Sequence, residues 1–180
     1  MSRQNLESKR AGGPPLPLGY AIGAGPSLFT PHNWTLTREA HPDRRFEVHY
    51  SAWEPILQGD PLRLEAVIRN LVDNAVKYSP SGSTIRIELA PHTEGLHLRV
   101  ADEGLGIPSH DLPRVFDGFF RGSNLPATQG GMGLGLYLCR QIIERHGGRI
   151  WAESQEGRGT TFHVVLPRER GQQHGARPAS

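Results

Sequence analysis

The sequence predicts an α/β (α+β) two-layer sandwich, in which about three helices cover one face of a mixed, mainly antiparallel sheet of about five strands. Three observations predict this class. Short segments that alternate between apolar and polar residues, as half-buried strands do, recur along the chain from residue 45 to residue 166. Two longer segments repeat apolar residues at helical spacing. The predicted order is strand, helix, hairpin, two helices and hairpin, with no internal repeat.

The first strand and the first long helix open this periodic region. The segment RFEVHY, residues 45–50, alternates and predicts a short strand. Asp60 is a suitable N-cap for the helix that follows, and Pro61 suits its first position. The pattern that comes next predicts a helix of roughly five turns, because its apolar residues repeat at helical spacing. These residues are Leu64, Val67, Ile68, Leu71, Val72 and Ala75.

Four further strands are predicted as two hairpins. The segments 83–89 (STIRIEL) and 96–102 (LHLRVAD) alternate strictly, and a short polar loop joins them. The segments 149–154 (RIWAES) and 160–166 (TTFHVVL) flank the turn QEGRG. Each pair is therefore expected to be antiparallel.

Two helical segments lie between the hairpins. Residues 109–120 predict a short helix capped by Ser109 or Asp111. Residues 133–148 (GLGLYLCRQIIERHGG) predict the second long helix, with Gly147 at its C-terminal cap.

Composition excludes several classes of function. With 20 basic and 18 acidic residues the net charge is +2, which provides no strong field for nucleic acid or an anionic membrane. Cys139 is the single cysteine, so an internal disulfide is excluded and a reducing, cytoplasmic compartment is expected. We expect Cys139 to be a packing residue rather than a redox sensor. The chain has neither an apolar run of the ~18 residues of a membrane span nor a signal peptide.

The two ends of the chain differ from the periodic region. Residues 1–40 contain the Gly/Pro-rich stretch AGGPPLPLGYAIGAGPS and are predicted to be a linker or a disordered tail. Residues 169–180 are polar and predict a loose C-terminal tail. The predicted domain therefore covers residues 41–168.

A polar stripe interrupts the first long helix. At 100° per residue, Asn70, Asn74 and Lys77 fall within about 60° of one another. Tyr78 lies one turn beyond Asn74. The stripe is either a solvated helix face or a face turned to a charged ligand, because amide oxygens suit Mg²⁺ and lysine suits phosphate. This segment alone does not decide between the two.

Two glycine-rich segments are candidates for the rest of a site. In DEGLGIP, residues 102–108, Asp102 ends a strand, and Gly104 and Gly106 would let the backbone approach a flat ligand closely. An ordinary turn would have the same sequence. In GGMGLGL, residues 130–136, alternating glycines enter a helix whose free N–H groups could bind phosphate. A flexible loop before a helix is the alternative.

Taken together, these motifs resemble a known family. From Arg45 to Pro167 the chain resembles the catalytic, ATP-binding domain of bacterial sensor histidine kinases. The superfamily also contains DNA gyrase, heat-shock chaperones and mismatch-repair ATPases. NLVDNAVKYSP resembles its asparagine box, DEGLGIP and GGMGLGL its glycine boxes, and VFDGFFRG its phenylalanine box. The ending HGGRIWAES followed by GTTF resembles histidine kinases more than the other branches.

The resemblance implies a role for each motif. Asn74 would coordinate Mg²⁺, and Asn70 would lie near the phosphates and the metal. Asp102 would accept a hydrogen bond from the adenine amino group. A flexible ATP lid would span residues 117–133. The remaining implied ATP-binding residues are Lys77, Tyr78, Gly104, Gly106, Ile107, Arg121, Gly131, Gly133, Leu134, Gly135, Leu136 and Thr160, with Lys77 and Arg121 on the phosphates.

The sequence departs from the family pattern in two places. ATP-hydrolysing members carry a glutamate one turn before the first asparagine, where this chain has Ala66, so weak intrinsic hydrolysis is expected. The acceptor histidine of a kinase lies on a dimerising helical hairpin, yet only His110 is followed by an acid, and it lies between motifs. The resemblance therefore implies a partner domain that carries the acceptor, a downstream response regulator, a monomeric chain and a homodimeric parent kinase.

Three other functions fit parts of the pattern. A stand-alone protein-serine kinase of the anti-sigma type also lacks the helical hairpin. A nucleotide-driven clamp needs a further transducer domain, for which 180 residues leave no space. A degenerate nucleotide-binding or interaction module would not need Asn74, Asp102 and the glycines.

Overall fold

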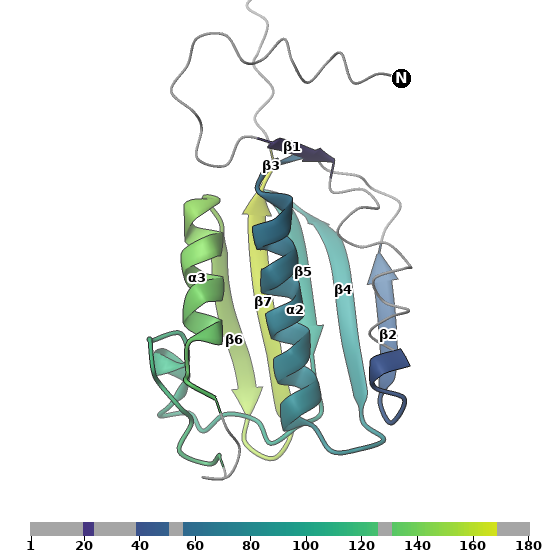
Figure 1. Ribbon diagram of the computed structural model, residues 1–180, viewed down its shortest axis with the longest axis vertical. Coiled ribbons are helices and arrows are strands. Elements are labelled where there is room, and N and C mark those ends of the chain that lie inside the picture. Colours follow the sequence, from purple (N-terminus) through teal and green to yellow (C-terminus); the bar gives the residue numbers. More distant parts are fainter. Residues whose placement is uncertain (1–19, 24–38, 51–55, 126–130, 169–180) are drawn as a thin grey trace, which may run out of the picture.

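The computed structural model describes residues 20–23, 39–50, 56–125 and 131–168. Its centre is a five-stranded sheet with the order β2-β4-β5-β7-β6, covered on one face by two α-helices (Figure 1). The helices are α2 (Pro61–Tyr78) and α3 (Gly135–Arg145). The strands of the sheet are β2 (Arg45–Tyr50), β4 (Thr84–His92), β5 (Gly95–Ala101), β6 (Arg149–Gln155) and β7 (Gly159–Pro167).

The sheet is mixed, as predicted. β2 pairs with β4 in parallel, and the other neighbours in the sheet are antiparallel. The two predicted hairpins are β4–β5 and β6–β7. The two-layer fold class is therefore confirmed. The third expected helix is only a single 3-10 turn, η2 (Leu112–Arg114), because Pro113 and Gly118 leave too short a segment for an α-helix.

A second, two-stranded sheet was not predicted. It pairs β1 (Tyr20–Gly23) with β3 (Ile56–Gly59) in antiparallel register. β1 lies inside residues 1–40, which the sequence predicted as linker or tail. Apart from 20–23 and 39–40, that segment lies outside the described residues, as does the predicted tail 169–180, so the domain boundaries stay a prediction.

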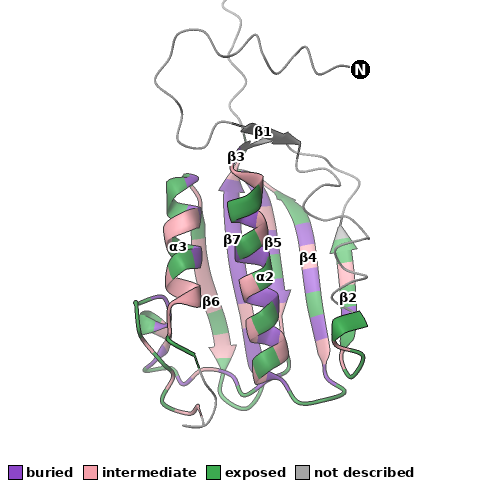
Figure 2. Ribbon diagram, in the orientation of Figure 1, coloured by how far each residue is buried: buried purple, intermediate pink, exposed green. Residues whose placement is uncertain are grey.

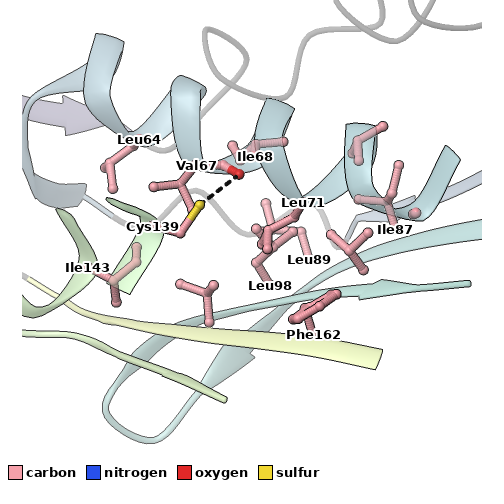
Figure 3. Close-up of a cluster of buried hydrophobic side chains, with 14 of the residues drawn as sticks. Leu64, Val67, Ile68, Leu71, Ile87, Leu89, Leu98, Cys139, Ile143 and Phe162 are labelled. Carbon is pink, nitrogen blue, oxygen red and sulfur yellow. Dashed lines mark hydrogen bonds between the residues drawn. The ribbon is translucent and has the colours of Figure 1, made fainter. Parts of the chain in front are cut away.

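The core lies between the two helices and the sheet. Figure 2 shows buried residues along the central strands and on the sides of α2 and α3 that face them. All six apolar residues predicted for the first helix are buried. They pack with residues such as Ile87, Leu98 and Phe162 of the sheet (Figure 3). Cys139 is part of this cluster, and burial raises the pKa of its thiol to about 12, so it is a packing residue. No helix in the described ranges is long and apolar enough to cross a membrane.

The predicted N-cap of α2 and the predicted C-terminal cap of α3 lie close together, and a side chain joins these two helix ends. Oδ1 of Asp60 accepts hydrogen bonds from the first free N–H groups of α2. At the end of α3, Gly147 has φ +72° and its N–H donates to Glu144, which is half of a Schellman motif. Between the two, the buried His146 accepts a hydrogen bond from the N–H of Asp60 at Nε2 (3.0 Å) and contacts the carbonyl of Ile142 at Nδ1 (2.7 Å). One side chain therefore joins the start of α2 to the end of α3.

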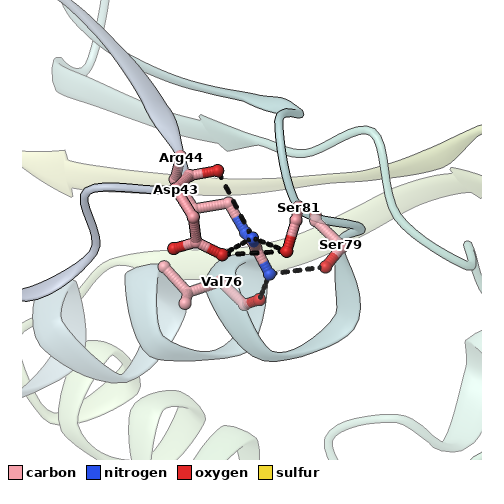
Figure 4. A network of polar contacts seen from close by, with 5 residues as sticks. All are labelled: Asp43, Arg44, Val76, Ser79 and Ser81. Carbon is pink, nitrogen blue, oxygen red and sulfur yellow. Dashed lines mark hydrogen bonds and ion pairs between the residues drawn. The ribbon is translucent and has the colours of Figure 1, made fainter.

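The other end of α2 is held by Arg44, a residue to which the sequence patterns gave no role. Its guanidinium donates to the carbonyl oxygens of Val76 (3.3 Å) and Ser79 (2.9 Å) and to the hydroxyl of Ser81 (3.0 Å) (Figure 4). It also forms an ion pair with Asp43. Carbonyl groups at a helix C-terminus lack intrahelical partners, and an arginine satisfies them well. Arg44 thereby fixes the last turn of α2, which belongs to the predicted site.

Candidate functional site

A cavity of about 300 Å³ opens beside the C-terminal half of α2. The loop after β5, the two described parts of the predicted lid and the start of α3 form its other walls. All of the predicted site residues except Asn70 and Gly104 line it. They are Asn74, Lys77, Tyr78, Asp102, Gly106, Ile107, Arg121, Gly131, Gly133, Leu134, Gly135, Leu136 and Thr160. Motifs separated by up to 86 positions along the chain, from residue 74 to residue 160, thus meet in one place.

The two asparagines have different positions. Nδ2 of Asn74 donates a hydrogen bond to Oδ1 of Asn70 (3.2 Å), which leaves Oδ1 of Asn74 available to a ligand in the cavity. Asn70 lies behind it, against the start of α3, where a Cβ on Gly135 would come within 2.5 Å of the Asn70 amide. Asn70 is therefore in contact with the site without lining it.

The fit of a metal ion can be judged from these donors. Within the described ranges, no group of three or more His, Cys, Asp or Glu side chains could hold a metal ion. A single amide oxygen at Asn74 fits Mg²⁺. This ion usually keeps several water ligands and takes most of its remaining ligands from substrate phosphates, so it needs few ligands from the protein. It does not fit a metal that needs a cage of protein ligands.

Asp102 is the carboxylate of the cavity. Its Oδ1 accepts hydrogen bonds from the N–H groups of Gly104 (2.8 Å) and Thr160 (3.3 Å). Burial raises the pKa of Asp102 to about 6, although these two hydrogen bonds act in the opposite direction. Among the described residues, Oδ2 has no hydrogen-bond donor, so it is the oxygen available to a ligand.

The glycines of the first loop are required for a reason that differs from the expected one. A Cβ on Gly104 would lie 2.4 Å from the carbonyl oxygen of Tyr78, and the N–H of Leu105 donates to that same oxygen (3.1 Å). Gly106 has φ +64°, and a Cβ there would lie 2.0 Å from the carbonyl oxygen of Gln155. The backbone that these glycines approach is the protein's own, at the ends of α2 and β6. They shape the cavity by letting the loop dock on these two elements.

The second glycine segment connects the lid to α3. Gly133 has φ +67°, and its carbonyl accepts a hydrogen bond from the N–H of Phe119 (3.0 Å), so the two described parts of the lid meet. A Cβ on Gly131 would lie 3.2 Å from Nζ of Lys77, which places the lysine beside this segment. The first turn of α3 has no side-chain cap, and Leu134, Gly135 and Leu136 at this helix start line the cavity. Residues 126–130 of the predicted lid lie outside the described residues.

Several residues at the site were missed by the sequence patterns. Asn124 donates from Nδ2 to the carbonyl of Gly106 (3.0 Å), and so connects the lid to the first loop.

Asp111 was predicted as a helix cap. It stands at the N-cap position of η2 without a capping hydrogen bond. It is buried and accepts from the N–H (2.6 Å) and hydroxyl (2.8 Å) of Ser123, which lower its pKa. The cavity is also lined by Leu105, Val115, Phe120, Gly122, Leu125, Met132 and Phe162.

Most of the residues in this list carried a signal, because they stand in motifs that were already tied to the site. They are Leu105 in DEGLGIP, Val115, Phe120 and Gly122 in VFDGFFRG, Met132 in GGMGLGL and Phe162 in GTTF. Leu125 stands in none of these motifs. The cavity therefore combines an apolar wall beside Asp102 and Thr160 with amide and basic groups at Asn74, Lys77 and Arg121. Such a division suits a flat polar base at one end and phosphates at the other.

Comparisons with known proteins show the family to which the chain belongs. A family model described as "Histidine kinase-, DNA gyrase B-, and HSP90-like ATPase" matches residues 59–170. The adaptive-response sensory kinase SasA of Synechococcus elongatus is 42% identical over 114 residues, covering 63% of this chain and 29% of SasA. The sensor histidine kinase WalK of Bacillus subtilis is 42% identical over 111 residues, covering 60% of this chain and 18% of WalK. The chain thus spans less than a third of either relative.

Solved structures show the same fold. The mycobacterial sensor histidine kinase MprB aligns with a TM-score of 0.68 at 31% identity, covering 76% of this chain and 91% of that one. The catalytic domain of the histidine kinase ThkA, in a nucleotide-free form, aligns with a TM-score of 0.66 at 29% identity, covering 76% and 88%.

Proposed function

Because the chain belongs to the family of histidine kinase-, DNA gyrase B- and HSP90-like ATPases, we propose that it binds Mg-ATP and donates the γ-phosphoryl group to a histidine on a separate domain. It carries the ATP-binding catalytic domain of the histidine-kinase type. The observation that supports the proposal most is the cavity itself, which joins Asp102 to Asn74, Lys77 and the glycines before α3.

Each residue at the cavity has a proposed task. Asp102 accepts a hydrogen bond from the adenine amino group through Oδ2. Lys77, Arg121 and the free N–H groups at the start of α3 hold the phosphates, whose charge they offset. Asn74 would hold a bound Mg²⁺ through its Oδ1, and the ion would supply positive charge that offsets the charge of the phosphates. The protein thus positions the nucleotide and stabilises charge, and the nucleophilic nitrogen comes from the acceptor domain.

The proposed partners follow from the absence of the nucleophile from the proposed catalytic domain. The acceptor histidine belongs to a dimerisation and phosphotransfer domain, and a response regulator receives the phosphoryl group from it. We further propose that this domain acts in the cytoplasm, as a monomer by itself and within a homodimeric kinase as a whole. The matched segment makes up less than a third of SasA and of WalK, which leaves room in these relatives for such domains.

Calorimetric titration of ATP, with and without Mg²⁺, tests the proposal. We expect saturable binding that Mg²⁺ strengthens. Asn74→Ala should remove the gain from Mg²⁺ while retaining metal-free binding. The matched control is Asp73→Ala, which removes an exposed side chain from the adjacent helix position and should leave the gain unchanged. Absence of saturable binding by the folded chain, or a gain from Mg²⁺ that survives Asn74→Ala, would contradict it.

Intrinsic hydrolysis of ATP is expected to be weak. Ala66 offers no base at the position one turn before Asn70, and the neighbouring carboxylate of Glu65 is paired with Arg69 (2.8 Å). A general base contributes about 10²- to 10⁴-fold to such a reaction, so phosphate release should be slower by that range than in members with the glutamate. Phosphate release under saturating Mg-ATP measures this. Steady multiple turnover by the wild-type chain would refute the expectation.

A further inference from the structure

Ser154 is a half-buried link between three segments of the candidate site, although it does not line the cavity. It lies on β6, and its Oγ makes three contacts. The N–H of Ile107 donates to it (2.8 Å), the carbonyl oxygen of Gly159 lies at 2.8 Å, and Oγ1 of Thr160 lies at 2.9 Å. Ile107 and Thr160 both line the cavity.

The direction of each hydrogen bond follows from counting protons. A hydroxyl group has one proton to donate and two lone pairs to accept with. The carbonyl oxygen of Gly159 can only accept, so the proton of Ser154 is used there. Since Ile107 occupies one lone pair of Ser154, the remaining contact must be a hydrogen bond donated by Thr160. The hydroxyl proton of Thr160 is therefore committed, and only its lone pairs are left for a ligand.

Because of this arrangement, the end of the cavity near Thr160 offers a ligand hydrogen-bond acceptors. The backbone N–H of Thr160 donates to Oδ1 of Asp102, so the Asp102 carboxylate lies next to Thr160. Both present acceptors to the cavity, namely Oδ2 of Asp102 and Oγ1 of Thr160. At the position of C6, such an acceptor-only surface binds the amino group of a 6-aminopurine. It disfavours an edge that carries a carbonyl oxygen at the same place.

We propose that Ser154 is a positioning residue for base selection, which holds the Thr160 hydroxyl proton away from the cavity and so disfavours 6-oxopurine nucleotides relative to 6-aminopurine nucleotides. This inference rests on the proposed ATP binding. Ser154 acts through Thr160 and touches no ligand itself. Without Ser154, the hydroxyl of Thr160 can rotate and donate to a carbonyl oxygen at C6 of the base.

The test compares ADP with IDP, which differ in the base edge at C6 and N1. Calorimetric titration of both nucleotides into wild type and Ser154→Ala gives the ratio of the two dissociation constants. We expect the preference for ADP to fall by about fivefold, which is the effect of one hydrogen bond. A purely structural role for Ser154 would change both affinities by the same factor and leave the ratio unchanged. That result, in a folded variant that binds ADP, would overturn the inference.

Two further variants keep the test decisive. Thr160→Val removes the hydroxyl and should by itself lower the preference for ADP. In this background Ser154→Ala should change the ratio no further, because its effect requires the hydroxyl. An effect of Ser154→Ala on the ratio that persists in the Thr160→Val background would refute the inference. If Ser154→Ala does not fold, a Thr160→Val protein with the wild-type ratio would refute it instead. Ser79→Ala is the control, since it removes a buried hydroxyl outside this network and should keep the ratio.

The failure of this inference and that of the proposed function can be told apart. A folded wild-type chain that binds neither nucleotide refutes the proposed function. A wild-type chain that prefers ADP, with the same ratio in Ser154→Ala, refutes only the role of Ser154.

Discussion

Asp102→Asn is expected to weaken ADP binding by about 100-fold, which corresponds to ~2.7 kcal/mol. The asparagine retains one oxygen to accept from the N–H groups of Gly104 and Thr160, in place of Oδ1. The NH₂ group of the asparagine then replaces Oδ2. It places a hydrogen-bond donor opposite the adenine amino group, which is itself a donor and needs an acceptor there. Two opposed donors in a buried site are more costly than the loss of one hydrogen bond alone.

Calorimetric titration of ADP into the wild type and the variant measures this effect. Glu103→Gln is the matched control, because it makes the same acid-to-amide change at the next residue, which is exposed and bonds to Thr84 and Arg86 instead. It should retain wild-type affinity. An Asp102→Asn protein that binds ADP within about threefold of wild type would mean that the carboxylate does not contact the base.

The raised pKa of Asp102 gives the same contact a pH dependence. Below about pH 6 the carboxyl group of the free protein is protonated, so ADP affinity should fall by about tenfold between pH 7 and pH 5. The folding stability of the nucleotide-free protein should change with pH in the opposite direction. Because the folded pKa lies above the unfolded one, the contribution of Asp102 to stability is present at low pH and is lost as pH rises through about 6. Asp102→Asn should remove both effects, and identical pH profiles for the two proteins would contradict the assignment.

Gly106→Ala is expected to destabilise the domain by about 3 kcal/mol or more. The new Cβ would lie 2.0 Å from the carbonyl oxygen of Gln155, and neither of the two backbone segments is a flexible side-chain end that could yield. The φ of +64° adds the strain of a left-handed conformation. Nucleotide binding should fall as well, since the carbonyl of Gly106 accepts the hydrogen bond from Asn124 that ties the lid to this loop.

Gly157→Ala provides the matched comparison, because it separates strain from collision. Gly157 has a similar φ of +75°, but a Cβ there would meet no atom within 4 Å. Its substitution should therefore cost only about 1–2 kcal/mol, from the backbone conformation. Urea unfolding of both variants gives the two free energies. Equal losses would show that the loop moves away from Gln155 at little cost.

Most of the elements, and much of the lining of the candidate cavity, could be predicted from the sequence alone. Helical and strand periodicity predicted α2, α3 and all five strands of the main sheet, since burial of one face imposes a repeat on the chain. The family resemblance that the motifs carry implied thirteen of the residues that line the cavity, from Asn74 to Thr160. Caps such as Asp60 and Gly147 were also readable, because a helix end needs a particular residue type at a particular position.

The contacts that join these elements to one another could not be predicted and are visible only in the folded structure. Arg44 on the end of α2, Asn124 on the carbonyl of Gly106 and Ser154 on the N–H of Ile107 each join a side chain to a segment remote from it in the sequence. The pairing of β1 with β3 is another contact of this kind. Such contacts fall on single polar residues, or on strands of four residues, and leave no periodic pattern. Burial repeats along a chain and can be read from it, whereas a hydrogen bond between distant segments exists only once the fold has brought them together.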